Sequence, residues 1–315
     1  MSASPRQARE RAAAIKRLAR EVGYVDCGIT TTEPFTRFER AVRERMERFP
    51  DAAGLYEKML HRVDLRAKRP WVRSVVVCVR QYGKYAIPVG LDEHIGRNYL
   101  FDRRAAACPD HAMPRRMKDG LRALGLRTAV GGCPDRWAAA RAGVARFGRN
   151  CFAISPVCGS WMNVECHLVD AELPPDEPTY ELACPDGCTA CIDACPTGAL
   201  TEPMSMRLDR CIAYLTYDAP EPIAPELWER MGPWVYGCDV CQRVCPLNEG
   251  KWVPRQRADW LDAVADQLTP QALAEMDEQT YRRVVHPLFW YIPAGDIERW
   301  HRNARRALAA QQAGG

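Results

Sequence analysis

The sequence predicts an α+β protein in three parts, and two features of the chain carry this prediction. Eight of the fifteen cysteines lie between residues 184 and 245, while the sequence before them mixes helical and strand-like patterns. The proline-rich run Pro174-Pro175-Asp176-Glu177-Pro178 is typical of a linker. We therefore expect a mixed helix-and-strand domain over residues 1–175, a cysteine-rich domain over 176–250, and a helical segment over 251–315.

The first part begins with helices and continues with alternating strands and helices. Ser4-Pro5 is a typical helix start, and the apolar residues that follow it recur at helical spacing as far as Ala19. Ser74–Val79 is short, apolar and rich in β-branched residues, which predicts a buried strand. The other expected elements are helices over 35–46, 114–124, 137–144, 271–284 and 296–310, and strands over 127–130 and 150–155.

The composition excludes several classes of protein. With 47% hydrophobic and 27% charged residues, the chain is an ordinary globular sequence, and its longest apolar run is far shorter than the roughly 20 residues of a membrane helix. We expect a cytoplasmic protein with no membrane partner, and an amphipathic first helix rather than a transit peptide over residues 1–21. The formal charge of +4 counts every cysteine as a neutral thiol, so it does not indicate nucleic-acid binding.

Fifteen cysteines in a chain of this length indicate metal or redox chemistry rather than a disulfide framework. Seven are scattered singly, and Cys78 among them has the setting of a small buried hydrophobic residue. The other eight form two groups. They are Cys184-x3-Cys188-x2-Cys191-x3-Cys195-Pro196, and Cys211 followed at a distance by Cys238-x2-Cys241-x3-Cys245-Pro246.

The spacing of both groups is typical of two [4Fe–4S] clusters. In such pairs the cysteine before proline ligates the other cluster, so the groups exchange their last members. We assign Cys184, Cys188, Cys191 and Cys245 to one cluster, and Cys195, Cys211, Cys238 and Cys241 to the other. The first gap is one residue longer than in the compact bacterial pattern, and the turn sequence Pro185-Asp186-Gly187 can absorb that residue. Two Cys₄ zinc sites are the alternative, although repeated Cys-x3-Cys-Pro is not typical of zinc.

The cysteine motifs, together with motifs upstream, resemble the epoxyqueuosine reductase family, which is related to the reductive dehalogenases. The resemblance is carried by Cys188-Thr-Ala-Cys191-Ile-Asp-Ala-Cys195-Pro196-Thr-Gly-Ala-Leu200, by Cys211-Ile-Ala-Tyr-Leu-Thr216, and by Tyr236-Gly-Cys238-Asp-Val-Cys241-Gln-Arg-Val-Cys245-Pro246. Upstream, Ala142-Gly143 through Phe147-Gly148-Arg149-Asn150 and Gly159-Ser160-Trp161 are similar to family segments.

This resemblance implies a cobalamin-dependent reductase in which two [4Fe–4S] clusters pass electrons to a base-off corrinoid. It further implies a nitroreductase-like fold for the first part and a bacterial-ferredoxin-like fold for the second. A low-potential donor such as ferredoxin or flavodoxin would then supply the electrons. By position, the residues expected to line the corrin are Gly148, Arg149, Asn150, Gly159, Ser160 and Trp161.

The family's catalytic aspartate has no direct counterpart, because Ala129 or Gly131 stands at its position. Asp135 is the nearest carboxylate and a candidate proton donor. It begins the helix containing Trp137, where an N-cap role and a pKa lowered by the helix dipole are the default expectation. Tyr99 is the second candidate donor. His94 lies in an incomplete version of a cobalt-ligating motif, and a surface histidine is the expected alternative.

Three functions remain open from the sequence. The first is reduction of a modified nucleoside in the manner of epoxyqueuosine reductase, with tRNA as partner, although the helical-repeat extension common in tRNA-binding members is not in this sequence. The second is dehalogenase-like reductive cleavage of another small organic substrate. The third is a two-cluster electron carrier or reductive activator without a substrate of its own.

Overall fold

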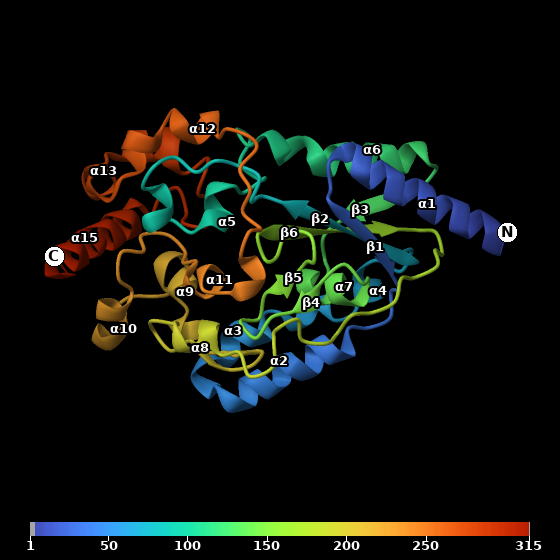
Figure 1. Ribbon diagram of the computed structural model, residues 1–315, viewed down its shortest axis with the longest axis horizontal. Coiled ribbons are helices and arrows are strands. Elements are labelled where there is room, and N and C mark those ends of the chain that lie inside the picture. Colours follow the sequence, from blue (N-terminus) through green and yellow to red (C-terminus); the bar gives the residue numbers. More distant parts are fainter. Residues whose placement is uncertain (1–3, 315) are drawn as a thin grey trace.

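The computed structural model describes residues 4–314 and is built around one antiparallel sheet with helices on both faces (Figure 1). The strand order is β1 (Asp26–Thr30), β2 (Ser74–Gln81), β6 (Met162–Val169) and β3 (Thr128–Val130). In Figure 1 the helices α1 and α6 lie above this sheet and α2, α3 and α7 lie below it. The mixed helix-and-strand class predicted from the sequence is confirmed.

The central strand β2 is buried on both faces, as its β-branched sequence predicts. Val76 and Cys78 pack toward α1 (Pro5–Val22) and α6 (Met113–Ala123). Val75, Val77 and Val79 belong to the opposite cluster, which includes side chains of α2 (Thr36–Arg48), α3 (Ala53–Glu57) and α7 (Asp135–Arg141). Ser4 caps α1 through its side chain, so the predicted helix start is confirmed.

The cysteine-rich part consists of short elements around two similar turns. The helices α8 (Ala190–Asp193) and α11 (Val240–Arg243) each contain the second cysteine of a Cys-x2-Cys motif, and α9 (Ile212–Tyr217) and α10 (Pro225–Arg230) lie between them. The small strands are β4 (Arg146–Phe147), β5 (Ala153–Ile154), β7 (Leu200–Glu202) and β8 (Ser205–Met206), and the short helices before them are α4 (Leu65–Lys68) and α5 (Arg97–Leu100).

The C-terminal helices are α12 (Asp259–Asp262), α13 (Pro270–Glu275), α14 (Glu278–Thr280) and α15 (Ile297–Gly314). The prediction of one continuous helix over 271–284 is therefore wrong, because the chain forms separate short helices there. The chain breaks after α13 because Asp277 starts a new helix by accepting the N–H of Thr280, and a single π-helical turn follows. The strand predicted over 150–155 is likewise reduced to β5, since Cys151 takes a positive φ of 66°.

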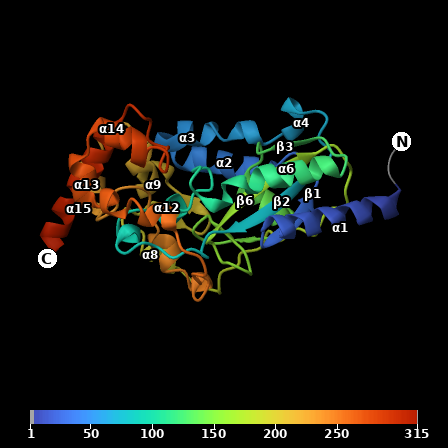
Figure 2. The ribbon, with the colours of Figure 1, turned by 90° about the horizontal axis from the view of Figure 1, so that it is seen from above.

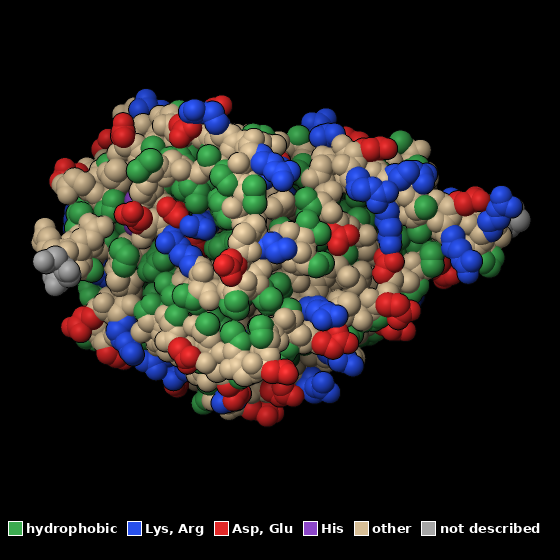
Figure 3. Space-filling view, in the orientation of Figure 1, with side chains coloured by type: hydrophobic (Ala, Val, Ile, Leu, Met, Phe, Trp, Pro, Cys, Tyr) green, Lys and Arg blue, Asp and Glu red, His purple; other side chains and the backbone are tan. Residues whose placement is uncertain are grey.

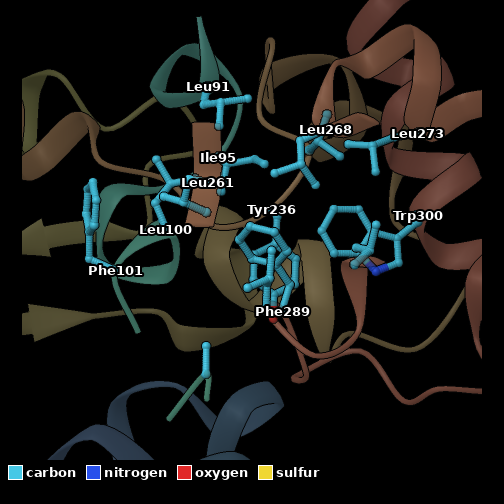
Figure 4. Close-up of a cluster of buried hydrophobic side chains, with 14 of the residues drawn as sticks. Leu91, Ile95, Leu100, Phe101, Tyr236, Leu261, Leu268, Leu273, Phe289 and Trp300 are labelled. Atoms are coloured by element: carbon cyan, nitrogen blue, oxygen red, sulfur yellow. The ribbon is translucent and has the colours of Figure 1, made fainter. Parts of the chain in front are cut away.

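One hydrophobic cluster takes side chains from all three predicted parts of the chain. Leu91, Ile95 and Phe101 pack with Tyr236 from the cysteine-rich part and Trp300 from α15 (Figure 4). The rings of Tyr236 and Trp300 stack with centroids 4.8 Å apart. The predicted boundaries thus mark changes of composition, while the core crosses them. Figure 2 shows α1 and α15 at opposite ends of the molecule. No described helix has the length and apolar character needed to cross a membrane.

Candidate functional site

Four of the eight clustered cysteines surround a small hollow near the surface. We call Cys184, Cys188, Cys191 and Cys245 the outer set. The Pro185-Asp186-Gly187 turn closes as expected, because the N–H of Cys188 donates to the carbonyl of Pro185 and Gly187 has φ of 70°. The extra residue of the first gap is thereby accommodated without displacing the sulfur from the hollow.

The other four cysteines line a second and larger space, and we call Cys195, Cys211, Cys238 and Cys241 the cavity set. Cys211 comes close to the others although it is distant in sequence, because α9 and α10 fold into a hydrophobic cluster of their own between them. The N–H groups of Ala213 and Tyr214 point at the Cys211 side chain. Backbone N–H groups aimed at a sulfur are typical of cluster ligands.

The structure thus brings together the same two groups of four cysteines that the sequence predicts as ligand sets. Among residues 4–314, no three His, Cys, Asp or Glu side chains converge tightly enough to hold a single metal ion. The assignment of the two sets to [4Fe–4S] clusters rests on their spacing in the sequence.

The cavity set opens onto a main cavity of about 400 Å³, which is within the usual size range of small-molecule sites. Its floor includes small and apolar side chains such as Ala153, Ala199 and Met162. Its wall carries Asp135, Tyr99 and several potential hydrogen-bond donors. The cavity set, Asp135 and Tyr99 therefore face one space.

Asp135 lies on this cavity at the first residue of α7, but it is not a cap. The N-cap position belongs to Pro134, and no side chain caps the helix. Burial raises the pKa of Asp135, and this effect outweighs the charges of Arg62, Arg136 and Arg103 and a hydrogen bond with Cys166. The expected N-cap role and lowered pKa are both wrong, because burial in the cavity wall dominates over the helix dipole.

The two residues at the family's aspartate position lie elsewhere. Ala129 is in β3 opposite Leu168, and Gly131 donates its N–H to the carbonyl of Cys166. Neither is among the residues that line the main cavity. Asp135, four to six residues further on, is the carboxylate that this loop delivers to the cavity.

Tyr99 also lines the main cavity, at the edge of an aromatic group. Its ring contacts Tyr217, Tyr236 and Tyr291 with centroids 5.1–5.8 Å apart. Burial raises the pKa of Tyr99 well above its usual value, and the neighbouring Tyr217 adds to the shift. The raised pKa keeps the Tyr99 hydroxyl protonated at neutral pH, and its side chain forms part of the cavity lining.

A chain of hydrogen bonds that the sequence analysis missed fixes one wall of the cavity. The buried Arg80 donates from Nη1 to Asn163 Oδ1 at 2.6 Å, and Asn163 Nδ2 donates to Asn98 Oδ1 at 2.7 Å. Arg80 has only donors, so it sets the direction of both amides. With its oxygen already used, Asn98 has its NH₂ group left to offer to the cavity.

A second buried network holds Arg103 at the same wall. Arg103 pairs with Glu165, whose carboxylate also accepts from Tyr24 and lies 2.8 Å from His167 Nε2. Burial alone would raise the pKa of Glu165, but the hydrogen bond from His167 and the charge of Arg103 lower it overall. Arg103 is thus held beside the cavity as a paired guanidinium.

The six residues expected to line a corrin are not all on the main cavity. Asn150 is on it and also on the outer hollow, with Nδ2 donating to the carbonyl of Cys241 at 3.1 Å. Arg149 lines the outer hollow, where its N–H donates to Cys184 Sγ at 3.3 Å. Both residues lie in the connection between the paired strands β4 and β5, where strand periodicity gives no indication of these contacts.

Gly159, Ser160 and Trp161 instead support the second cysteine loop. Ser160 donates its N–H to Asn248 Oδ1 at 2.7 Å and accepts from Gln242 and Asn248 through its hydroxyl oxygen. A Cβ on Gly159 would lie 2.2 Å from Asn248 Oδ1, so this glycine permits close approach to the protein's own loop. Gly148, likewise, is not among the residues lining the main cavity.

His94 is buried and hydrogen-bonds through Nε2 to the carbonyl of Leu268 at 2.8 Å. It lies in the C-terminal core region and not on the main cavity, whose described lining includes no histidine. His94 is therefore neither placed on the main cavity, as a cobalt ligand there would be, nor exposed at the surface, which was the expected alternative.

Comparison with known proteins finds similarity in the cysteine-rich part of the chain and also in the sequence around it. Residues 184–248 match the model of the 4Fe-4S double cluster binding domain. The chain is 31% identical over 256 residues to an epoxyqueuosine reductase of Xanthomonas campestris, covering 76% of this chain and 70% of that protein. It is 30% identical over 241 residues to the Staphylococcus aureus enzyme of that name, covering 73% of this chain and 62% of that protein.

Solved structures agree in fold. An epoxyqueuosine reductase with a tRNA-Tyr epoxyqueuosine-modified stem loop matches 96% of this chain and 81% of that one, at 25% identity and a TM-score of 0.73. A Bacillus subtilis epoxyqueuosine reductase, described with the loop of its catalytic aspartate swung out of the active site, has a TM-score of 0.70 at 25% identity. The chain spans about three fifths of the Staphylococcus aureus and Bacillus subtilis proteins in sequence.

Proposed function

Because the chain belongs to the epoxyqueuosine reductase family, we propose that it is a two-cluster reductase that reduces an epoxide of a modified nucleoside in its main cavity. The observation that carries this proposal is that the cavity set and Asp135 line the same space. Reduction of an epoxide to an alkene consumes two electrons and two protons and releases water. Two one-electron clusters, one of them held by the cavity set, and an acid on the same cavity would meet these two requirements.

The two cysteine sets are proposed as the ligands of two [4Fe–4S] clusters. Burial raises the pKa of Cys191 to about 11, with further contributions from Cys184 and Cys245, so the Cys191 thiol needs a bound cation to ionise at neutral pH. A cluster supplies that positive charge through its iron ions. The outer set would accept electrons, and the cavity set would pass them to the cavity.

The cavity also fits a corrinoid in its chemistry. A corrin is a flat, largely apolar ring with amide groups around its rim, and the cavity combines an apolar floor with donors at its wall. We propose that Asn98 and Asn163 meet the carbonyl groups of such a rim, and that Arg103 holds an anionic or carbonyl group beside them. When bound, the corrinoid supplies a strongly reducing metal centre. The absence of histidine from the described lining is compatible with a base-off state.

Asp135 is proposed as the proton donor. Burial keeps its carboxyl protonated to a higher pH than usual, and its first-turn position on α7 fixes its direction toward the cavity. Cys166, its hydrogen-bond partner, is buried beneath it on β6. The carboxyl is therefore held in place by the sheet while it remains open to a substrate.

The test is an anaerobic reaction with reconstituted clusters, cobalamin, a chemical reductant and an epoxyqueuosine-containing tRNA stem loop, followed by mass spectrometry of the nucleosides. Loss of one oxygen from the modified base is the expected result. If cobalamin is bound and reduced but the epoxide persists, another substrate must occupy the cavity. Reductive cleavage of a different small molecule is then the second candidate, because the same cavity and acid would serve it.

A further inference from the structure

The outer set lies against a second hollow that the proposed reaction does not use. This hollow has a volume of about 540 Å³ and is separate from the main cavity. It shares Cys245 and Pro246 with the small hollow of the outer set. Its other lining residues are Arg97, Trp161, Arg243, Val244, Asn248, Glu249, Gly250 and Trp252. A proposed ligand of the outer cluster, the buried Cys245, thus borders this hollow.

The surface around Cys245 combines two exposed valines with charged and aromatic side chains. Val244 is 40% exposed, and Val253, just beyond Trp252, is 43% exposed. Figure 3 shows hydrophobic side chains gathered over α8 and α11, with charged side chains beside them. Arg97 lies over the rings of Trp161 and Trp252, at 5.1 and 4.7 Å from their centroids. Tryptophan, arginine and exposed apolar groups are the residues enriched in protein interfaces.

The charges beside this hollow are unevenly distributed. Arg97 and Arg243 share a single carboxylate, Asp92, at 2.8 and 3.3 Å. The ammonium of Lys251 donates to the carbonyl of Pro156. The lining itself holds two positive residues, Arg97 and Arg243, and one acid, Glu249, and Lys251 follows the lining residue Gly250 in the chain. The α8 side has the opposite character.

On the α8 side the exposed Asp186 lies in the turn between Cys184 and Cys188, and Asp193 ends the short helix. A partner approaching Cys245 with a negative surface is therefore favoured on the α11 side and disfavoured on the α8 side. This polarity gives the surface a preferred orientation of docking.

We propose that the hollow beside Cys245 is the docking surface of a small acidic electron-carrier protein, which reduces the outer cluster. This proposal rests on the proposed function in one respect, namely that the outer set holds a cluster. Each carrier gives up one electron and leaves oxidised, and the outer cluster gains that electron.

The experiment follows cluster reduction by stopped-flow absorbance, using stoichiometrically pre-reduced acidic [2Fe–2S] ferredoxin and the cluster-loaded chain without corrinoid or substrate. Lys251→Glu and Arg243→Glu are each expected to lower the second-order rate constant about tenfold at low ionic strength, with the difference vanishing at high salt. Iron content, measured for every variant, verifies that the clusters remain. Arg115→Glu, on the distant helix α6, is the matched control and leaves the rate unchanged.

Two outcomes overturn the proposal. Equal rates for wild type and both variants exclude this surface, and a lower rate for Asp186→Lys in place of Lys251→Glu puts docking on the α8 side. Dithionite, which needs no docking surface, reduces all variants equally in the expected case. Because no epoxide is present, failure here is distinguishable from failure of the proposed reaction, and absence of iron in the wild type refutes both.

Discussion

Replacing Asp135 by asparagine tests the proposed proton donor with little change of shape. The carboxyl lies on the main cavity and hydrogen-bonds with Cys166, and asparagine can keep that contact through its carbonyl oxygen. What it loses is the transferable proton. A positioned general acid contributes roughly 10²–10⁴-fold to a rate, so we expect turnover to fall by that factor.

The pH dependence of turnover gives a second, independent test of Asp135. Because burial raises the pKa of Asp135, the wild type stays protonated above the usual range of an aspartic acid, and its turnover declines as pH rises through that raised pKa. The same shift makes the charged carboxylate a cost to folding at neutral pH: its stabilising contribution is fully present at low pH and is lost as pH rises. Asp135→Asn is therefore expected to keep or slightly raise the melting temperature at pH 8.

The assay combines single-turnover kinetics over a pH series with thermal unfolding and cofactor analysis. Asp119→Asn, on the exposed surface of α6, serves as a carboxylate control away from the cavity. Turnover of Asp135→Asn within threefold of wild type, with clusters and corrinoid bound, would refute the assignment. A large loss of stability at pH 8 would instead show that the carboxylate stabilises the fold, contrary to the raised pKa.

Three further predictions follow from the same site. Iron analysis of the anaerobic protein should give about eight atoms per chain, as expected for two [4Fe–4S] clusters, and Cys211→Ala should lose one cluster while EPR still detects the other; zinc in place of iron would contradict both ligand sets. EPR of the cobalamin-loaded protein in its Co(II) state should lack nitrogen splitting from a histidine, and His94→Ala should leave the spectrum unchanged; a splitting that this variant removes would reverse the assignment. Asn98→Asp should weaken cobalamin binding by 10-fold or more in an absorbance titration, because a carboxylate replaces the donor that Arg80 and Asn163 orient; unchanged binding would mean that the ligand does not meet this wall.

The two cysteine sets were predictable from sequence because each is built on a short motif and because, in paired motifs of this kind, the cysteine before proline ligates the other cluster. Short gaps and the Pro185-Asp186-Gly187 turn bring Cys184, Cys188 and Cys191 to one hollow, while Cys211 and Cys245 reach their sets from distant parts of the chain. The buried strand over 74–79 was predictable for a similar reason, since its β-branched residues have no polar alternation. In the strand and in each Cys-x2-Cys motif, the residues that give the signal lie within a few positions of one another in the chain.

The polar wall of the cavity could not be found in the same way. In β6, Asn163, Glu165 and His167 alternate with apolar residues, a pattern that usually indicates one solvated face. Here that face is covered, and Arg80 and Arg103 pair with it from segments 60 or more residues away in the chain. Only the tertiary arrangement shows that this strand face is buried and hydrogen-bonded. The alternation of polar and apolar residues predicts the strand, but it does not predict that other segments cover its polar face.

Asn150 shows how the two cysteine sets are joined in one unit. It contributes to the lining of both hollows, and its amide donates to the carbonyl of Cys241 while its oxygen accepts the N–H of Phe152. The neighbouring Arg149 N–H donates to Cys184 of the outer set. One short loop from the sheet domain therefore contacts both sets, and it fixes their separation independently of the long α9–α10 insertion. Electron transfer between two centres depends steeply on their distance, so a loop that holds both sets would also influence the rate of transfer between the proposed clusters. The same sheet domain carries Asp135, so one rigid unit would position both the clusters and the proposed proton donor.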